Sequence, residues 1–74
     1  MKRSYYTAIV REEDSGFVSL CPELDVASQG DTIEIAVANL KEAVELLLET
    51  APQVESHLRE HRHIFVTQFK AVYS

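Results

Sequence analysis

The sequence predicts an α+β domain in which one long helix packs on a face of a small antiparallel sheet. Two observations carry this prediction. Between Ile33 and Leu48 the apolar residues recur every three or four positions, which is the spacing of one buried helical stripe. Before and after that stretch, β-branched and aromatic residues alternate in short runs bounded by turn-forming residues. The expected order of elements is therefore β-β-β-α-β.

The first two strands are expected to form a hairpin. Ser4–Arg11 is rich in β-branched and aromatic residues on both faces, as in an inner strand. Glu12–Gly16 reads as a turn, in which the glycine is free to adopt a positive φ. The second strand covers Phe17–Leu20 and ends before Pro22, because proline cannot donate to a strand ladder.

The helix has two candidate caps and one clear stop. Asp31 can cap the first turn with Glu34 three residues later, and Thr32 is a competing cap with no acid at its own third position. The helix should end near Thr50, since Pro52 disfavours a helical conformation at the residue before it.

Three further segments complete the expected order. A short third strand is predicted around Asp25–Ser28. After the helix, Pro52–Arg62 is polar and carries Val54 and Leu58 four residues apart, a pattern compatible with a short helix. His63–Tyr73 alternates aromatic and branched residues on both faces and is predicted to be the last strand.

Length and cysteine content indicate one small domain that needs support. A core built from 74 residues rarely supplies more than about 3–5 kcal/mol of net stability without disulfides, metal or self-association. Cys21 is the single cysteine, so no disulfide can form within the chain. We expect Cys21 to be a small buried apolar residue in a reducing compartment, and we expect a homodimer or a higher homo-oligomer.

Charge and hydropathy narrow the classes of partner. Twelve acids against seven lysines and arginines give a formal charge of −5, which argues against nucleic-acid binding and suits a basic partner. No apolar run approaches the roughly 20 residues of a membrane span, and no signal-peptide core follows the basic N-terminus. The expectation is a cytoplasmic protein with no membrane contact.

Catalysis and metal binding are not expected from the sequence. The acids lie in a turn, near a strand end and at a helix cap, and nothing in their order makes them converge on paired metal ions. His57 and His61 would share a helical face, and His63 could join them, which is a spacing compatible with zinc. Surface histidines in a charged stretch are the preferred interpretation, so no cofactor or metal is predicted.

The outer face of the helix offers a contact surface. Ile35 and Leu46 are eleven residues apart and therefore lie on one side, opposite the core stripe. Two aligned apolar side chains in a domain short of core favour contact with a partner or with another copy, although isolated exposed apolar residues are common.

Several segments taken together resemble the N-terminal domain of HicB-type antitoxins. They are Tyr6-Thr7-Ala8, the Glu-Glu-Asp-Ser-Gly turn with Phe17, Cys21-Pro22-Glu23-Leu24, Ser28-Gln29-Gly30-Asp31-Thr32, Ala36, Asn39-Leu40 and Glu42-Ala43. The resemblance implies a β-β-β-α-β fold like a truncated RNase H domain without the nuclease acids. It also implies an antitoxin that binds a small basic HicA-type toxin, an mRNA ribonuclease, and covers its catalytic histidine.

The sequence departs from this family pattern in three places. It stops at Ser74, so we expect one HicB-like domain over 1–74, without the C-terminal DNA-binding domain of many members and without direct DNA binding. Asp25-Val26-Ala27 stands where many members have Pro-Gly, and Ile35 stands where members often carry Glu. The second departure implies a different turn, and the third enlarges the apolar outer face.

Two functions follow as alternatives. The first is a non-catalytic antitoxin of a type II toxin–antitoxin system, whose acids meet a basic surface. The residues predicted to do so are Glu12, Glu13, Asp14, Glu23 and Asp25, with Ile35 and Leu46 as the apolar contact. The second is a solitary, self-associating regulatory or structural module with no toxin partner.

Overall fold

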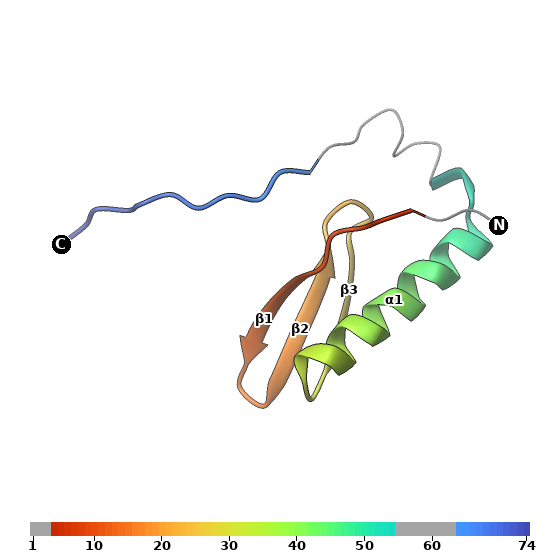
Figure 1. Cartoon of the computed structure of the whole chain (residues 1–74), viewed down its shortest axis with the longest axis horizontal. Helices are drawn as coiled ribbons and strands as arrows, with labels where there is room; N and C mark the ends of the chain where they lie inside the picture. Colours follow the sequence, from red (N-terminus) through yellow and green to blue (C-terminus); the bar gives the residue numbers. More distant parts are fainter. Residues whose placement is uncertain (1–3, 55–63) are drawn as a thin grey trace.

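The computed structural model describes residues 4–54 and 64–74 and confirms the α+β class. A three-stranded antiparallel sheet in the order β1-β2-β3 is followed by one long helix that covers one face of the sheet (Figure 1). The elements are β1 (Ile9–Glu13), β2 (Gly16–Cys21), β3 (Val26–Gly30) and α1 (Ile33–Thr50).

Two tight connections set the register of the sheet. Glu13 pairs with Gly16, so only Asp14 and Ser15 connect β1 to β2. The φ of Gly16 is not positive, which corrects the prediction for this residue. Gly16 is required for another reason, because a Cβ there would lie 2.8 Å from the carbonyl oxygen of Gly30. The β2–β3 connection contains Asp25 at φ 55°, a conformation that aspartate tolerates better than most residues.

The boundaries of β1 differ from the prediction. The strand begins at Ile9, not Ser4, and continues through Glu12 and Glu13, which the sequence placed in the turn. The two-residue connection explains the extension, because a shorter turn keeps the two acids in the ladder opposite Phe17 and Gly16. Among the described strands β1 lies at an edge of the sheet, not inside it.

The limits of α1 agree with the prediction, and its cap is resolved. Thr32 is the N-cap, since its hydroxyl accepts a hydrogen bond of 3.1 Å from the backbone N–H of Ile35. At the other end the N–H of Ala51 bonds the carbonyl of Leu47 at 2.8 Å, and Pro52 follows. The stop near Thr50 is therefore confirmed.

The core between sheet and helix is small. Its buried side chains come from β2 and from one stripe of α1: Ser19, Cys21, Ala36, Leu40 and Val44. The Ser19 hydroxyl donates a hydrogen bond of 2.7 Å to the carbonyl of Ala36, which ties the middle strand to the helix. Cys21 is buried as predicted.

The predicted last strand is not formed in the described residues. Residues 64–74 contain no helix or strand, and each of them is exposed. A strand requires a partner for its backbone groups, and alternation alone does not supply one. His63, the first residue of that predicted strand, lies outside the described residues, as do His57, His61 and most of the predicted short helix.

Candidate functional site

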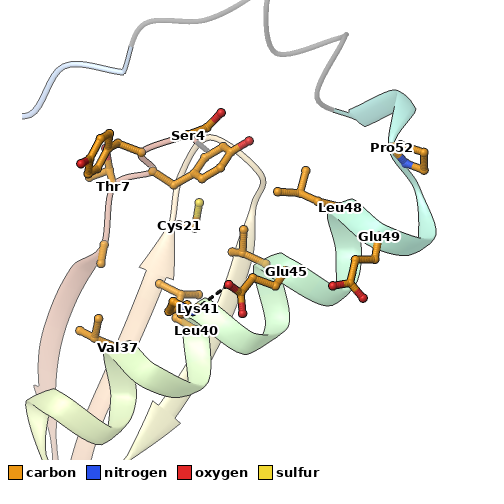
Figure 2. Close-up of a pocket in the computed structure, with 14 residues that line it drawn as sticks. Ser4, Thr7, Cys21, Val37, Leu40, Lys41, Glu45, Leu48, Glu49 and Pro52 are labelled. Carbon is orange, nitrogen blue, oxygen red and sulfur yellow. Dashed lines mark hydrogen bonds and ion pairs between the residues drawn. The ribbon is translucent and has the colours of Figure 1, made fainter. Parts of the chain in front are cut away.

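A groove lies between α1 and the segment that precedes β1. It has a volume of about 870 Å³ and is the candidate site of this domain (Figure 2). It exists because α1 packs mainly over β3 and β2, so that within residues 4–54 and 64–74 the sheet covers little of the helix on the side toward β1. Its lining residues are Ser4, Tyr5, Tyr6, Thr7, Ala8, Cys21, Val37, Leu40, Lys41, Val44, Glu45, Leu48, Glu49 and Pro52.

The groove is apolar at its base and charged along its rim. Leu40 and Val44 of the core form the base, and Leu48 extends it toward the end of α1. On the rim, Lys41 Nζ lies 2.7 Å from Glu45 Oε2, an exposed pair four residues apart on the helix. The Glu45 carboxylate raises the pKa of Lys41, so this lysine stays charged. Such a site suits an apolar segment better than a small charged molecule.

Glu23 fixes the N-terminal wall of the groove. Its two carboxylate oxygens accept hydrogen bonds of 2.9 and 3.2 Å from the backbone N–H of Thr7, and one of them accepts a third of 2.8 Å from the Thr7 hydroxyl. Burial acts to raise the pKa of Glu23, but the hydrogen bonds from Thr7 and Cys21 outweigh burial and the pKa is lowered. The ionised carboxylate therefore clamps residues 4–8 to the β2–β3 turn.

Cys21 lies next to Glu23, and its thiol is unreactive. It is fully buried, and its Sγ donates a weak hydrogen bond of 3.5 Å to Glu23 Oε1. Burial raises the pKa of the thiol, and the neighbouring carboxylate adds to the effect. Because the thiolate is the reactive form, this cysteine contributes packing and not nucleophilic chemistry.

Sequence comparisons place the chain in a family. A protein of Synechocystis sp. called a UPF0150 protein is 44% identical over 50 residues, which cover 66% of this chain and 69% of that relative. A second UPF0150 protein of the same organism is 39% identical over 49 residues, covering 65% of this chain and 71% of the relative.

The chain belongs to the UPF0150 family. A third member from Synechocystis sp. is 45% identical over 47 residues, or 61% of this chain and 60% of that relative. No family model matches the chain. No solved structure matches it either. The names of these relatives state no activity and no partner, so function is argued from the residues.

The structure of this UPF0150 domain divides the predicted partner-binding acids into two groups. Glu12 and Glu13, at the end of β1, and Asp14, in the β1–β2 turn, are exposed, whereas Glu23 and Asp25 lie in the β2–β3 turn. The six residues of β2 separate these turns, which corresponds to about 20 Å. A small-molecule ligand therefore cannot contact both groups at once.

The members of the two groups also differ in their availability. Glu13 Oε2 already pairs with Arg11 Nε at 2.6 Å on the exposed surface. Glu23 is engaged with Thr7, as described above. Glu12, Asp14 and Asp25 are exposed. These three acids are therefore the predicted contacts that best fit an incoming basic surface.

The predicted apolar pair on α1 is exposed, as expected. Ile35 is 47% exposed and Leu46 is 61% exposed. A Cβ built on Gly30 would lie 2.6 Å from Ile35 Cγ2, so the Ile35 side chain lies close to Gly30 at the end of β3. Neither residue lines the groove. The pair and the groove are separate surfaces of the UPF0150 domain.

The described body of this UPF0150 chain is far more acidic than the whole. Between residues 4 and 54 there are ten acidic side chains against two basic ones, a formal charge of −8, compared with −5 for the chain. In residues 4–54 and 64–74, no three His, Cys, Asp or Glu side chains are grouped so that they could hold a metal ion. No helix within the same residues is long and apolar enough to cross a membrane.

Sequence reasoning missed the groove and the Glu23 clamp. The groove had a detectable signal, because Val37 widens the apolar stripe of the helix beyond what three short strands can cover. The hydrogen bonds between Glu23 and Thr7 had no signal in the sequence, since the two residues are sixteen positions apart and their pairing depends on the fold.

Proposed function

We propose that this UPF0150 chain is a non-catalytic binding protein for a small basic protein, acting as the antitoxin of a HicA-type ribonuclease. The observation that carries the proposal is the formal charge of −8 on residues 4–54, with Arg11 and Lys41 as the only basic side chains there. The resemblance to HicB-type antitoxins supplies the class of partner. Binding covers the basic RNA-contacting surface of the toxin, and no bond is made or broken by this chain.

The exposed acids give this binding its expected character. Charges of one sign steer an oppositely charged partner and raise its association rate, and salt screens the effect. The β1–β2 end of the sheet is the better docking point, because Glu12 of β1 and Asp14 of the turn are both exposed and the side chain of neither makes a described hydrogen bond or ion pair. Asp25 marks the second acidic point, at the opposite end of β2.

The test is a binding titration with a HicA-type toxin whose catalytic histidine has been replaced, at two salt concentrations. We expect Glu12→Lys with Asp14→Lys to weaken the complex at least tenfold at low salt, mainly through the association rate. Asp25→Asn tests the acid of the distant turn separately, because asparagine keeps the tolerance for positive φ while removing the charge.

The two outcomes separate clearly. A complex weakened by the paired reversal but not by Asp25→Asn places the toxin at the β1–β2 turn. A wild-type chain that binds no basic ribonuclease at low salt contradicts the antitoxin function. Glu23 is not used in this test, because its replacement would release Thr7 and confuse folding with binding.

The alternative function, a self-associating module without a toxin, has one structural observation in its favour. The apolar residues of the C-terminal segment are exposed in the single chain, as Val66, Phe69 and Val72 show at 66%, 89% and 88% exposure. Surfaces of this kind are typical of contacts between chains.

A further inference from the structure

The C-terminal segment 64–74, hereafter the arm, is extended and apolar. It carries no acidic side chain and only one basic one, Lys70. Phe69 and Tyr73 are both 89% exposed, and they share a strand face with Ala71. Figure 1 shows the arm running away from the sheet rather than along it. A strand-like sequence of this composition requires both a backbone partner and an apolar surface.

The outer edge of β1 offers the backbone partner. In the described sheet β1 pairs with β2 alone, so every second residue of β1 directs its N–H and C=O groups to the unpaired side. Residues 4–8 continue the chain ahead of β1, and Glu23 holds them in place through Thr7. Residues 4–13 together give ten positions, close to the eleven of the arm.

The groove beside that edge offers the apolar surface. On its helical side it runs from Val37 to Leu48 and on to Pro52, a length of about 22 Å at the rise of an α-helix. The aromatic side chains of the arm, at Phe65, Phe69 and Tyr73, span about 26 Å at the rise of a strand. The row of aromatic side chains on the arm and the groove therefore match in length, and both are apolar.

We propose that the arm of one copy adds to the β1 edge of a second copy and places its aromatic face in the groove, with the exchange made in both directions. A second copy is favoured over the arm's own chain because residues 64–74 are all exposed in the single chain and run away from the sheet (Figure 1). The arm also brings little charge to a body of formal charge −8, whereas two such bodies repel when they meet directly.

The area of this exchange is sufficient for a stable dimer. An aromatic side chain buries about 150–250 Å², so three of them remove roughly 600 Å² of arm surface per copy and twice that in a reciprocal exchange. The aliphatic residues of the arm and the groove walls add to this figure. Stable interfaces bury about 1,200–2,000 Å² in total, which the exchange reaches.

The first experiment measures the mass of the full chain by sedimentation equilibrium over a range of concentrations. We expect a dimer, and we expect Phe69→Ser with Tyr73→Ser to raise its dissociation constant at least a hundredfold. Gln68→Ser, on the opposite face of the arm, is the matched control and should leave the dimer intact. A chain that stays monomeric throughout, or a dimer that survives the double variant, overturns the proposal.

The second experiment distinguishes exchange between copies from closure within one. In a Cys21→Ala background, a chain with Lys41→Cys on the groove rim is mixed with a chain of different mass carrying Ala71→Cys on the arm. A short bismaleimide should then join the two chains into a covalent heterodimer. One chain carrying both cysteines that cross-links only to itself, at monomer mass, would show that the arm fills its own groove and would overturn the exchange.

Discussion

At the scale of single residues, two polar side chains hold the elements together. Ser19 is fully buried and reaches from β2 to the Ala36 carbonyl, while Glu23 reaches from the β2–β3 turn to Thr7. Both are typical of a small domain, in which a few buried or partly buried hydrogen bonds complement a limited apolar core. Neither role was predicted from the sequence, since each depends on a partner that only the fold brings near.

Glu23 should make the stability of the fold depend on pH. Its folded-state pKa is lowered from the usual 4.5, so its contribution is complete above that value and is lost as the pH falls through the lowered one. We expect Glu23→Gln to cost about 1–2 kcal/mol near pH 7 and almost nothing at strongly acidic pH, where the wild-type carboxyl is protonated. Urea unfolding at several pH values measures this difference. An equal loss at every pH would contradict the assignment.

The buried hydroxyl of Ser19 should be worth a smaller, pH-independent amount. Ser19→Ala removes the donor to the Ala36 carbonyl, and we expect a loss of about 1 kcal/mol in the free energy of unfolding. Ser15→Ala, in the exposed β1–β2 turn, is the control and should be neutral. Unfolding measured at one protein concentration makes the comparison valid even for a dimer.

At the scale of elements, periodicity predicted the helix best. The limits of α1 follow from the apolar stripe and from Pro52, both of which act locally. The strands were located less well, because their ends depend on pairing, as the continuation of β1 to Glu13 opposite Gly16 shows. The prediction of a last strand was wrong because that strand also depends on pairing. Residues 64–74 have strand-forming side chains but no strand partner in the described chain.

The helix cap provides a test in which two neighbours give opposite results. Thr32 accepts the N–H of Ile35, so Thr32→Ala should lower stability by about 1 kcal/mol. Asp31→Ala should have little effect, because Asp31 precedes the cap and is exposed. Thermal unfolding followed by helical circular dichroism reports both. A larger loss for Asp31→Ala would restore the aspartate as the functional cap.

Gly30 should be the least replaceable residue between β3 and α1. An added Cβ would lie 2.6 Å from the backbone nitrogen of Ala36 and 2.6 Å from Ile35 Cγ2. The first of these neighbours is backbone and can move only with the helix, so we expect Gly30→Ala to cost about 1–3 kcal/mol. Ala27→Gly, in the same strand, is a control for propensity alone. Propensity alone makes Ala27→Gly destabilising and would make Gly30→Ala stabilising. A Gly30→Ala chain that is as stable as the wild type, or more stable, in urea unfolding would therefore exclude the steric cause.

At the scale of the whole molecule, charge is unevenly distributed along the chain. Residues 4–54 carry a formal charge of −8, and the remaining positions carry five basic residues against two acids, which restores the total to −5. The acidic body and the weakly charged arm therefore suit different partners. The body suits a basic protein, and the arm suits an apolar groove next to an open strand edge.

Salt should therefore move the two proposed associations in opposite directions. The Debye screening length falls from about 10 Å at 0.1 M salt to about 3 Å at 1 M, so added salt weakens the attraction between the body and a basic partner. The same screening reduces repulsion between two bodies of formal charge −8, while apolar contacts of the arm persist. We expect the self-dissociation constant to fall several-fold between these concentrations, as sedimentation equilibrium can measure. A dimer that dissociates in salt would instead be held by ion pairs, with Lys70 as the arm's only charged side chain, and Lys70→Gln would then disrupt it at low salt as well.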